Sequence, residues 1–260
     1  MPELPEVESV VRAHRARLVG RRITGFECRW SRQAVPSATR VRAGVVGRRI
    51  RDVPRRGKFI VLHLDRGGVL IHLRMSGRLE WAGSGERIRD PHVRAVLRLD
   101  DGARLLFCDA RKFGRVIFHE RPAEALAALG VEPLGRSFTP RLLSGLMSAR
   151  RRRLKPLLLD QSVIAGLGNI YVDEALFAAG LHPLATSDSL AGPQVARLHR
   201  AIRSVLALAI RMNGTSFDWI YPGGHMQDHL SVYGRTGEPC RRFGTAIENL
   251  RVGQRGTHVF

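Results

Sequence analysis

The chain has 260 residues, and its 43 Lys and Arg against 23 Asp and Glu give a formal net charge of +20. Only three basic residues are lysines, which indicates a bias toward arginine codons, but such a bias does not account for the excess of bases over acids. That excess indicates a polyanionic partner and favours nucleic acid over an acidic membrane surface, because no basic amphipathic helix stands alone in the sequence. The three scattered cysteines argue against a disulfide framework, and no apolar run approaches the length of a membrane span. An acidic N-terminus without an apolar signal core predicts a cytoplasmic protein.

The first half of the chain is predicted to be a β-rich domain that follows one helix. Residues 5–18 should form that helix, because their apolar residues fall near helical spacing and Pro5 suits the first turn. From about residue 22 to 119 the pattern changes to short β-type runs, for example 59–62, 69–73, 93–99 and 105–107. Turn signals separate these runs, and short strands at this spacing suggest a β-sandwich or barrel. We assign residues 1–130 to an N-terminal β-sandwich flanked by helices.

The second half is predicted to be mainly helical. Residues 131–138 are expected to form a linker. Helical patterns follow at roughly 140–147, 152–160, 169–179 and 194–212. We assign 139–230 to a helical domain and 231–260, where strand-like pieces surround a turn, to a C-terminal β-hairpin. The predicted fold class is therefore α+β with several domains.

The N-terminus carries a candidate nucleophile. Pro2 permits removal of Met1, which would leave a secondary amine at the chain terminus. An α-amine has a reference pKa of about 7.7–8.0, so a useful fraction is neutral at pH 7 and can attack the C1′ carbon of a sugar to form an iminium. Glu3, the next residue, could protonate the ring oxygen or shuttle protons. Taken alone, these residues are better explained as a helix start, where proline and acidic side chains are favoured.

Seven motifs, in order along the chain, change that balance. They are 2–8 (PELPEVE), 57–59 (GKF), 72–77 (HLRMSG), 109–114 (DARKFG), 161–174, 232–235 (VYGR) and 253–257 (GQRGT). With this ordered set the sequence resembles the formamidopyrimidine-DNA glycosylase (MutM, Fpg–Nei) family over nearly its whole length. Glu6, Glu174 and Tyr233 belong to these motifs and are included among the expected site residues. The resemblance also implies that the helical domain is a helix–two-turn–helix element.

The resemblance implies a bifunctional DNA glycosylase and AP lyase of base excision repair. Such an enzyme excises oxidised purines of the formamidopyrimidine and 8-oxoguanine type from duplex DNA through a Schiff base on Pro2, followed by β,δ-elimination. It implies damaged double-stranded DNA as the partner, no membrane, a monomer, and a bacterial cytoplasmic location at the nucleoid. Two alternatives stay open: a same-fold glycosylase for oxidised pyrimidines, and a non-catalytic DNA-lesion binding protein. The segment between Gly214 and Ser231, with Trp219 and Tyr221, corresponds to the part that encloses the oxidised purine in the family.

The resemblance implies a phosphate clamp in the DNA-binding set. Its expected members are Lys58, His72, Asn169 and Arg255, of which Lys58 and Arg255 are also assigned, with Pro2 and Glu3, to the catalytic set. Lys155 matches a family position near the damaged base. Plainer explanations exist for some of these residues: Lys58 could be a solvated lysine at a strand end, and Asn169 a helix cap.

Three further residues are implied to enter the duplex when the damaged base is flipped out. They are Met75, Arg111 and Phe113. An extruded nucleotide leaves a hole whose lost stacking costs a few kcal/mol, which methionine can fill and phenylalanine can wedge open, while arginine can bind the orphaned base. Core packing is the alternative for Met75 and Phe113, although the basic neighbours of Phe113 make a poor core setting.

The sequence departs from the family at the C-terminal finger, which commonly binds zinc through two Cys-x-x-Cys pairs. Here the first pair keeps Cys240 but has Phe243 in its second place, and no second pair follows. Cys240 and His258 together supply two ligands, whereas a closed tetrahedral site takes four. We therefore expect no zinc and no other cofactor. Either contacts with the helical domain hold the hairpin in place, as in zincless relatives of the family, or the chain is a truncated form.

Overall fold

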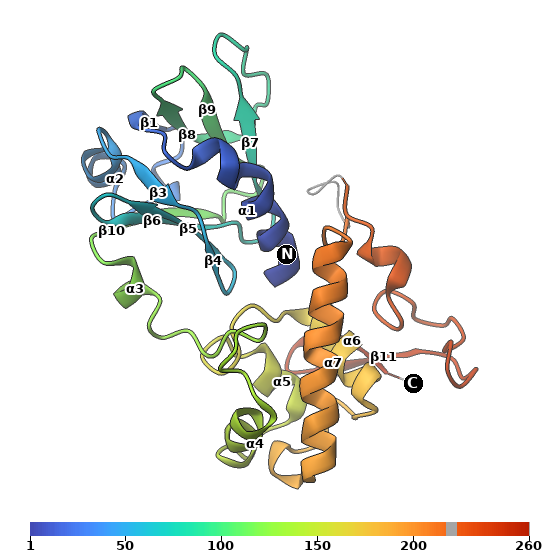
Figure 1. The fold of residues 1–260 in the computed structure, drawn as a ribbon. Helices are drawn as coiled ribbons and strands as arrows, with labels where there is room; N and C mark the ends of the chain where they lie inside the picture. The colour runs from blue at the N-terminus through green and yellow to red at the C-terminus, as the bar shows by residue number, and fades with distance from the viewer. Residues whose placement is uncertain (217–222, 260) are drawn as a thin grey trace. The chain divides into compact units, whose positions relative to one another are not determined.

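The computed structural model describes residues 1–216 and 223–259, which form two compact units (Figure 1). The first unit extends from Met1 to Ala127, and the second begins at Ala128 and includes the C-terminal hairpin. In the described parts of the chain, no helix combines the length and the apolar character needed to cross a membrane. Trp219 and Tyr221, which the sequence suggested near the damaged base, lie outside the described residues.

The first unit contains two sheets, which confirms the predicted β-sandwich. The first sheet has the order β1 (Ile23–Cys28), β8 (Val93–Leu99), β9 (Arg104–Asp109), β7 (Gly77–Ala82), and all of its pairs are antiparallel. The second has the order β2 (Ala34–Val35), β10 (Arg115–His119), β6 (Gly68–His72), β5 (Phe59–Leu64), β3 (Ile50–Asp52), with β4 (Arg55–Arg56) paired to β5. The helices of this unit are α1 (Leu4–Leu18), α2 (Ala38–Val45) and α3 (Pro122–Ala125).

One hydrophobic core joins these elements. It contains residues of both sheets, such as Phe107 of β9 and Ile71 of β6, together with Val7 and Leu18 of α1. Because successive side chains of a strand point to opposite faces, this shared core requires the two sheets to face each other. Helix α1 contributes the apolar positions whose spacing predicted it.

The second unit is built from four α-helices among its described residues and ends in a hairpin. They are α4 (Pro140–Ser148), α5 (Leu154–Leu159), α6 (Asn169–Ala179) and α7 (Gly192–Arg211), and the hairpin strands are β11 (Glu248–Val252) and β12 (Arg255–Val259). Nearly every residue of α6 is buried, as expected for a helix that is apolar on most of its surface. Gly180 ends this helix in the left-handed conformation, with φ 62°.

The domain boundary corrects the predicted linker at 131–138. These residues belong to the second unit, where Val131 forms a parallel bridge with Ile164 and Phe138 is buried. The glycine and proline of this stretch indicated a linker, but they serve a turn in which the Gly135 N–H donates to the Glu132 carbonyl at 3.0 Å. The segment is thus part of the packed helical unit.

Candidate active site and nucleic-acid interface

The N-terminal segment leads directly into helix α1. Pro2 and Glu3 are both buried, and Glu3 is the residue that precedes the first helical turn. Glu3 and Glu6 form a capping box, in which the Glu6 carboxylate accepts the Glu3 backbone N–H at 2.8 Å. This bond fixes the backbone beside Pro2, so Glu6 positions the segment that carries the expected nucleophile.

Lys58 and His72 lie on neighbouring strands of the second sheet. Lys58 immediately precedes β5, and Phe59, the first residue of that strand, pairs with His72 at the end of β6. The Phe59 and His72 rings meet edge to face, with centroids 4.7 Å apart. Lys58 is only 6% exposed, so it is not a solvated lysine at a strand end.

The His72 imidazole is held in its neutral form. The Arg74 backbone N–H donates to His72 Nδ1 at 3.1 Å, which places the imidazole proton on Nε2. Burial, reinforced by the charges of Arg74 and Lys58, lowers the pKa of His72 to about 4. Neutral His72 therefore presents an Nε2–H donor, which is a group that binds phosphate oxygens.

Two loops cross between the sheets at one end of the sandwich. One connects β6 to β7 and carries Met75; the other connects β9 to β10 and carries Arg111 and Phe113. The strands that they join are paired at this end, because Arg115 lies opposite His72 in one sheet and Gly77 opposite Asp109 in the other. The two loops are therefore neighbours, although more than thirty residues separate them in sequence.

The expected intercalating side chains are on the surface. Met75 is 36% exposed and Phe113 is 48% exposed, so the core-packing alternative is wrong for both. The Arg111 guanidinium lies over the Phe113 ring, 5.0 Å from its centroid, and the Lys112 ammonium lies 4.3 Å from that of Trp30. An exposed phenylalanine among cations suits contact with stacked, negatively charged nucleic acid.

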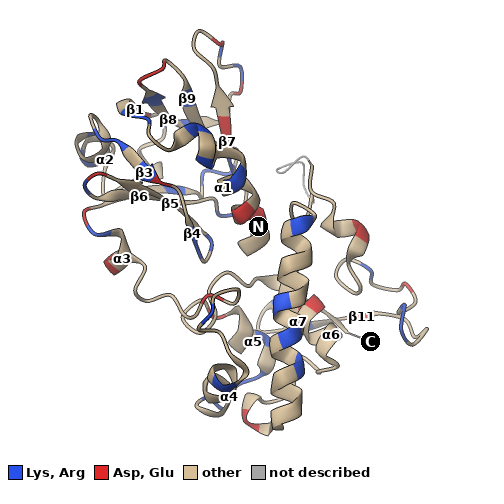
Figure 2. Cartoon of the chain, in the orientation of Figure 1, with Lys and Arg blue, Asp and Glu red and all other residues tan. Residues whose placement is uncertain are grey.

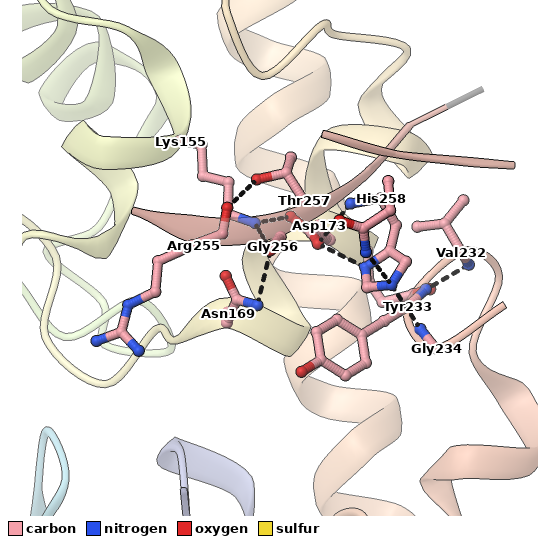
Figure 3. Close-up of polar contacts among 12 residues, drawn as sticks. Lys155, Asn169, Asp173, Val232, Tyr233, Gly234, Arg255, Gly256, Thr257 and His258 are labelled. Atoms are coloured by element: carbon pink, nitrogen blue, oxygen red, sulfur yellow. Dashed lines mark hydrogen bonds and ion pairs between the residues drawn. The ribbon is translucent and has the colours of Figure 1, made fainter. Parts of the chain in front are cut away.

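In the second unit, Lys155 and Asn169 belong to a polar network around one buried carboxylate (Figure 3). Asp173 of α6 accepts the Lys155 ammonium at 2.6 Å, and it also accepts the backbone N–H and Nδ1–H of His258. The Gly256 carbonyl accepts Lys155 Nζ at 2.8 Å and Asn169 Nδ2 at 3.0 Å. These bonds join α5, the start of α6 and strand β12.

The Lys155 side chain lies inside this network. Its side chain has no exposed surface and is paired with Asp173, so in this structure it does not reach a solvent-facing phosphate or base. The reason is a long-range ion pair, which the spacing of motifs does not reveal. Asn169 is the first residue of α6, and Gly168 rather than Asn169 caps the helix.

Arg255 follows a two-residue hairpin turn. Gly253 and Gln254 have φ values of 56° and 63°, and Val252 pairs with Arg255 across the turn, as in a type I′ hairpin. The Arg255 side chain is exposed and extends away from the Asp173 network (Figure 3). The hairpin thus presents a guanidinium at the beginning of β12.

Glu174 and Tyr233 have structural contacts that hold the segment before the hairpin. Glu174 is buried, and its carboxylate accepts the backbone N–H groups of Ser231, Val232 and Tyr233 at 2.8–2.9 Å. The Tyr233 ring packs against His258, with centroids 4.8 Å apart. Both residues fix the 231–234 segment to α6 and β12.

The residues of the hairpin do not fit a zinc ion. Cys240 is buried in an apolar cluster with Phe177, Val232 and Ile247. Both His258 nitrogens are engaged, because Nδ1 bonds Asp173 and Nε2 accepts the Gly234 N–H at 3.2 Å. A zinc ligand would need a lone pair that points to the metal and three partners.

A second group of potential ligands lies in the first unit. Glu80, Asp90 and Cys108 come within 4.8 Å of one another. Arg78 forms ion pairs with both carboxylates, and burial raises the pKa of the Cys108 thiol, so this sulfur stays protonated. Arg78 thus already occupies both carboxylates and offsets one of their two negative charges.

Sequence analysis assigned no role to three polar residues that organise the site, although they stand in the motifs 72–77, 109–114 and 161–174. They are Ser76, Asp109 and Asp173. Each of them is buried, and each lies inside or beside an apolar stretch of the sequence. A lone acid within an apolar stretch, such as Asp173 in the helix 169–179, is the signal that could have identified a buried site residue.

Positive charge is spread over both units, including α1 and α7, whereas the start of α1 is acidic (Figure 2). A β-sandwich with exposed insertion-type side chains and a helical unit with a basic hairpin turn define a DNA-binding protein of the helix–two-turn–helix class. Residues 1–116 match the formamidopyrimidine-DNA glycosylase N-terminal domain, and residues 129–219 match the formamidopyrimidine-DNA glycosylase H2TH domain. The chain belongs to the formamidopyrimidine-DNA glycosylase family.

Individual relatives agree with this membership. The formamidopyrimidine-DNA glycosylase of Chloroflexus aggregans is 48% identical over 267 residues, which cover 99% of this chain and 96% of the relative. That of Symbiobacterium thermophilum is 44% identical, covering 99% and 87%. The Lactococcus lactis enzyme bound to DNA with an N7-benzyl-Fapy-dG superposes with a TM-score of 0.91 at 33% identity, covering 99% and 97%. The same enzyme bound non-covalently to DNA with an AP site gives 0.90 at 34% identity, covering 98% and 97%.

Proposed function

We propose that this protein is a bifunctional DNA glycosylase and AP lyase that removes oxidised purines, of the formamidopyrimidine and 8-oxoguanine type, from duplex DNA in base excision repair. The observation that carries the proposal is the full-length similarity to formamidopyrimidine-DNA glycosylases, including one solved with a Fapy-dG type lesion. The capping box that fixes the backbone beside Pro2 supports it further. The enzyme works as a monomer on damaged double-stranded DNA in the bacterial cytoplasm, at the nucleoid and without a membrane.

Pro2 is the nucleophile once Met1 has been removed. Its nitrogen lone pair forms a bond to C1′ while the C1′–base bond breaks, and the base leaves with the bonding electrons and takes up a proton. Glu3 protonates the ring oxygen, which opens the sugar to an iminium. Loss of a C2′ proton then breaks the C3′–O bond, and a second elimination breaks the C5′–O bond.

The remaining site residues bind and deform the DNA. Lys58 offers its charge to backbone phosphates, and neutral His72 donates its Nε2–H to them. From the helical unit, the Asn169 amide and the Arg255 guanidinium bind phosphates as well. Met75, Arg111 and Phe113 fill the space of the extruded nucleotide. The hairpin works without zinc, because buried contacts of Cys240 and Asp173 replace the metal.

The test traps the iminium with borohydride on an 8-oxoguanine duplex. One protein carries an N-terminal extension that keeps Pro2 in a peptide bond, and a protease then removes the extension to leave Pro2 first. The matched pair should give no adduct before cleavage and an adduct after it, on a peptide that begins with Pro2. An adduct before cleavage, or one mapped to a lysine, contradicts the assignment.

A panel of duplexes distinguishes the alternatives. Excision of 8-oxoguanine and formamidopyrimidines ahead of oxidised pyrimidines supports the proposed lesion class, and the reverse order shows a pyrimidine enzyme. Lesion binding without strand cleavage by the mature protein would show a non-catalytic binder.

A further inference from the structure

We infer that Ser76 and Asp109 are positioning residues that lock the Met75 loop and the Arg111–Phe113 loop together, so that both enter the DNA as one unit. The inference rests on the proposed role of Met75, Arg111 and Phe113 in filling the duplex. Neither Ser76 nor Asp109 touches the reacting atoms in this scheme; both act through the loops that they hold.

A chain of hydrogen bonds links the two loops. The Ser76 hydroxyl donates to Asp109 Oδ1 at 2.5 Å and accepts the Arg111 backbone N–H at 3.0 Å. Asp109 Oδ2 accepts the Gly114 N–H at 2.7 Å. One carboxylate therefore closes the 109–114 loop at its far end, and one hydroxyl ties that loop to the Met75 loop.

The backbone of each loop needs such support. Arg74 and Lys112 both adopt left-handed conformations, with φ 55° and 62°, which side-chain-bearing residues rarely hold without compensating contacts. In the first loop, the Gly77 N–H donates to the Leu73 carbonyl at 2.9 Å. Each turn presents its following residue, Met75 or Phe113, to solvent.

The floor of the second loop is equally constrained. A Cβ added at Gly114 would come 2.4 Å from Cζ of Phe107, a core residue of β9. The Asp109 carbonyl also accepts Arg94 Nε at 3.0 Å. The loop therefore rests on the rigid sheet, and the Ser76–Asp109 bond transmits this rigidity to Met75.

A buried carboxylate is a costly way to add stability alone. Ser76 and Asp109 are 6% and 0% exposed, and apolar residues of similar shape stabilise an interior as well as a buried polar group does. What the polar pair adds is direction, since each hydrogen bond fixes one backbone position. Preorganised loops lose less entropy when they insert between bases.

The experiment compares Ser76→Ala with Phe113→Ala and with the double variant, in the full-length mature protein. Ser84→Ala, which changes an exposed serine of the same unit, is the matched control. Binding is measured to undamaged, 8-oxoguanine and abasic-analogue duplexes. Fluorescence of 2-aminopurine next to the lesion reports extrusion of the base, and thermal unfolding reports stability.

Ser76→Ala should remain folded and bind undamaged DNA within about twofold of the parent. Its lesion-dependent binding and its 2-aminopurine signal should fall about tenfold, with a smaller loss on the abasic duplex, where no base is extracted. In the Phe113→Ala background, Ser76→Ala should change lesion binding less than about twofold, because its effect passes through the loops. Asp109→Asn, which keeps the side-chain shape, repeats the test at the other end of the bond and decides it where Ser76→Ala does not fold.

Three results overturn the inference. Lesion binding by the double variant could fall by the product of the two single-variant losses, or Ser76→Ala could weaken binding to all duplexes equally. Either result would show that Ser76 only stabilises the fold. If Ser76→Ala and Asp109→Asn bind the lesion duplex fully while Phe113→Ala does not, the positioning role of Ser76 and Asp109 is refuted. The insertion role of Phe113 then still stands. Full lesion binding by Phe113→Ala would instead refute the insertion role itself, and the inference with it.

Discussion

The Asp173 carboxylate lies 2.6 Å from the Lys155 ammonium, and neither side chain has any exposed surface. The same carboxylate accepts hydrogen bonds from the backbone N–H and the ring of His258, which lies in strand β12 after the Gly253–Gln254 turn. The pair therefore anchors strand β12 to helix α6. These buried contacts attach the hairpin to α5 and α6 through side chains and backbone groups of the protein itself.

Removing the lysine should destabilise the second unit. Lys155→Met leaves the Asp173 charge buried without its cation, for which we expect a loss of about 3–5 kcal/mol in the free energy of unfolding. Urea unfolding, with hydrogen exchange of the α6 and β12 amides, measures it. Arg151→Met is the matched control, because Arg151 forms an exposed ion pair with Asp188 at 3.7 Å and should cost less than about 1 kcal/mol.

The opposite outcome is informative. Lys155→Met could leave the free energy of unfolding unchanged and weaken lesion binding. That result would place Lys155 at the DNA, as the family resemblance implies, and would mean that this network rearranges.

The second prediction concerns metal. The purified protein should contain well below one zinc per chain, and a chelator should leave its unfolding temperature unchanged, because Cys240 packs among apolar side chains. Cys240→Val should fold and bind DNA, since valine suits the cluster, whereas Cys240→Asp should destabilise by at least about 2 kcal/mol through burial of an unpaired charge. Stoichiometric zinc, or loss of folding in Cys240→Val, would contradict this.

The sequence predicts local elements well and long-range pairing poorly. The helix 169–179 coincides with α6, because Gly168 and Gly180 bound an apolar run, and the strand pattern at 59–62 lies within β5. In contrast, Lys155 could not be assigned to Asp173 from spacing alone, because the pair depends on how α5 packs against α6. Nor does the sequence show that the loops of Ser76 and Asp109 are neighbours, which follows from strand order.

The third prediction follows from the lowered pKa of His72. An unfolded histidine takes up its proton near pH 6.5, whereas folded His72 does so only near pH 4. Between these values the unfolded chain binds more protons, so this contribution to stability is complete above pH 6.5 and is lost as the pH falls toward 4. The two pKa values differ by about 2.5 units, and each unit corresponds to about 1.4 kcal/mol, so the contribution is at most about 3–4 kcal/mol.

Urea unfolding between pH 4 and 7.5 tests this contribution. His72→Asn, which keeps an acceptor for the Arg74 N–H, should flatten the acid side of the stability profile. The control His63→Asn changes an exposed histidine of β5 and should not. Identical profiles for the parent and His72→Asn would show that His72 is not held neutral by the fold.

The last prediction separates the phosphate contacts from the inserted residues. Arg255→Ala should weaken binding to undamaged, lesion and abasic duplexes alike and lower the salt slope of log K by about one, because a phosphate contact releases counterions whatever the sequence. Phe113→Ala should keep undamaged binding and its salt slope, and lose lesion binding by the few kcal/mol that unstacking costs. Arg111→Ala should alter the dependence on the base opposite the lesion, since that base is its partner. Salt-titrated binding of the three variants measures all of these effects. Phe113 is 48% exposed, so its removal should not weaken binding to every duplex by unfolding the protein. A uniform loss of binding by Phe113→Ala would therefore mean that Phe113 also contacts undamaged DNA. Its insertion would then not depend on extrusion of a base.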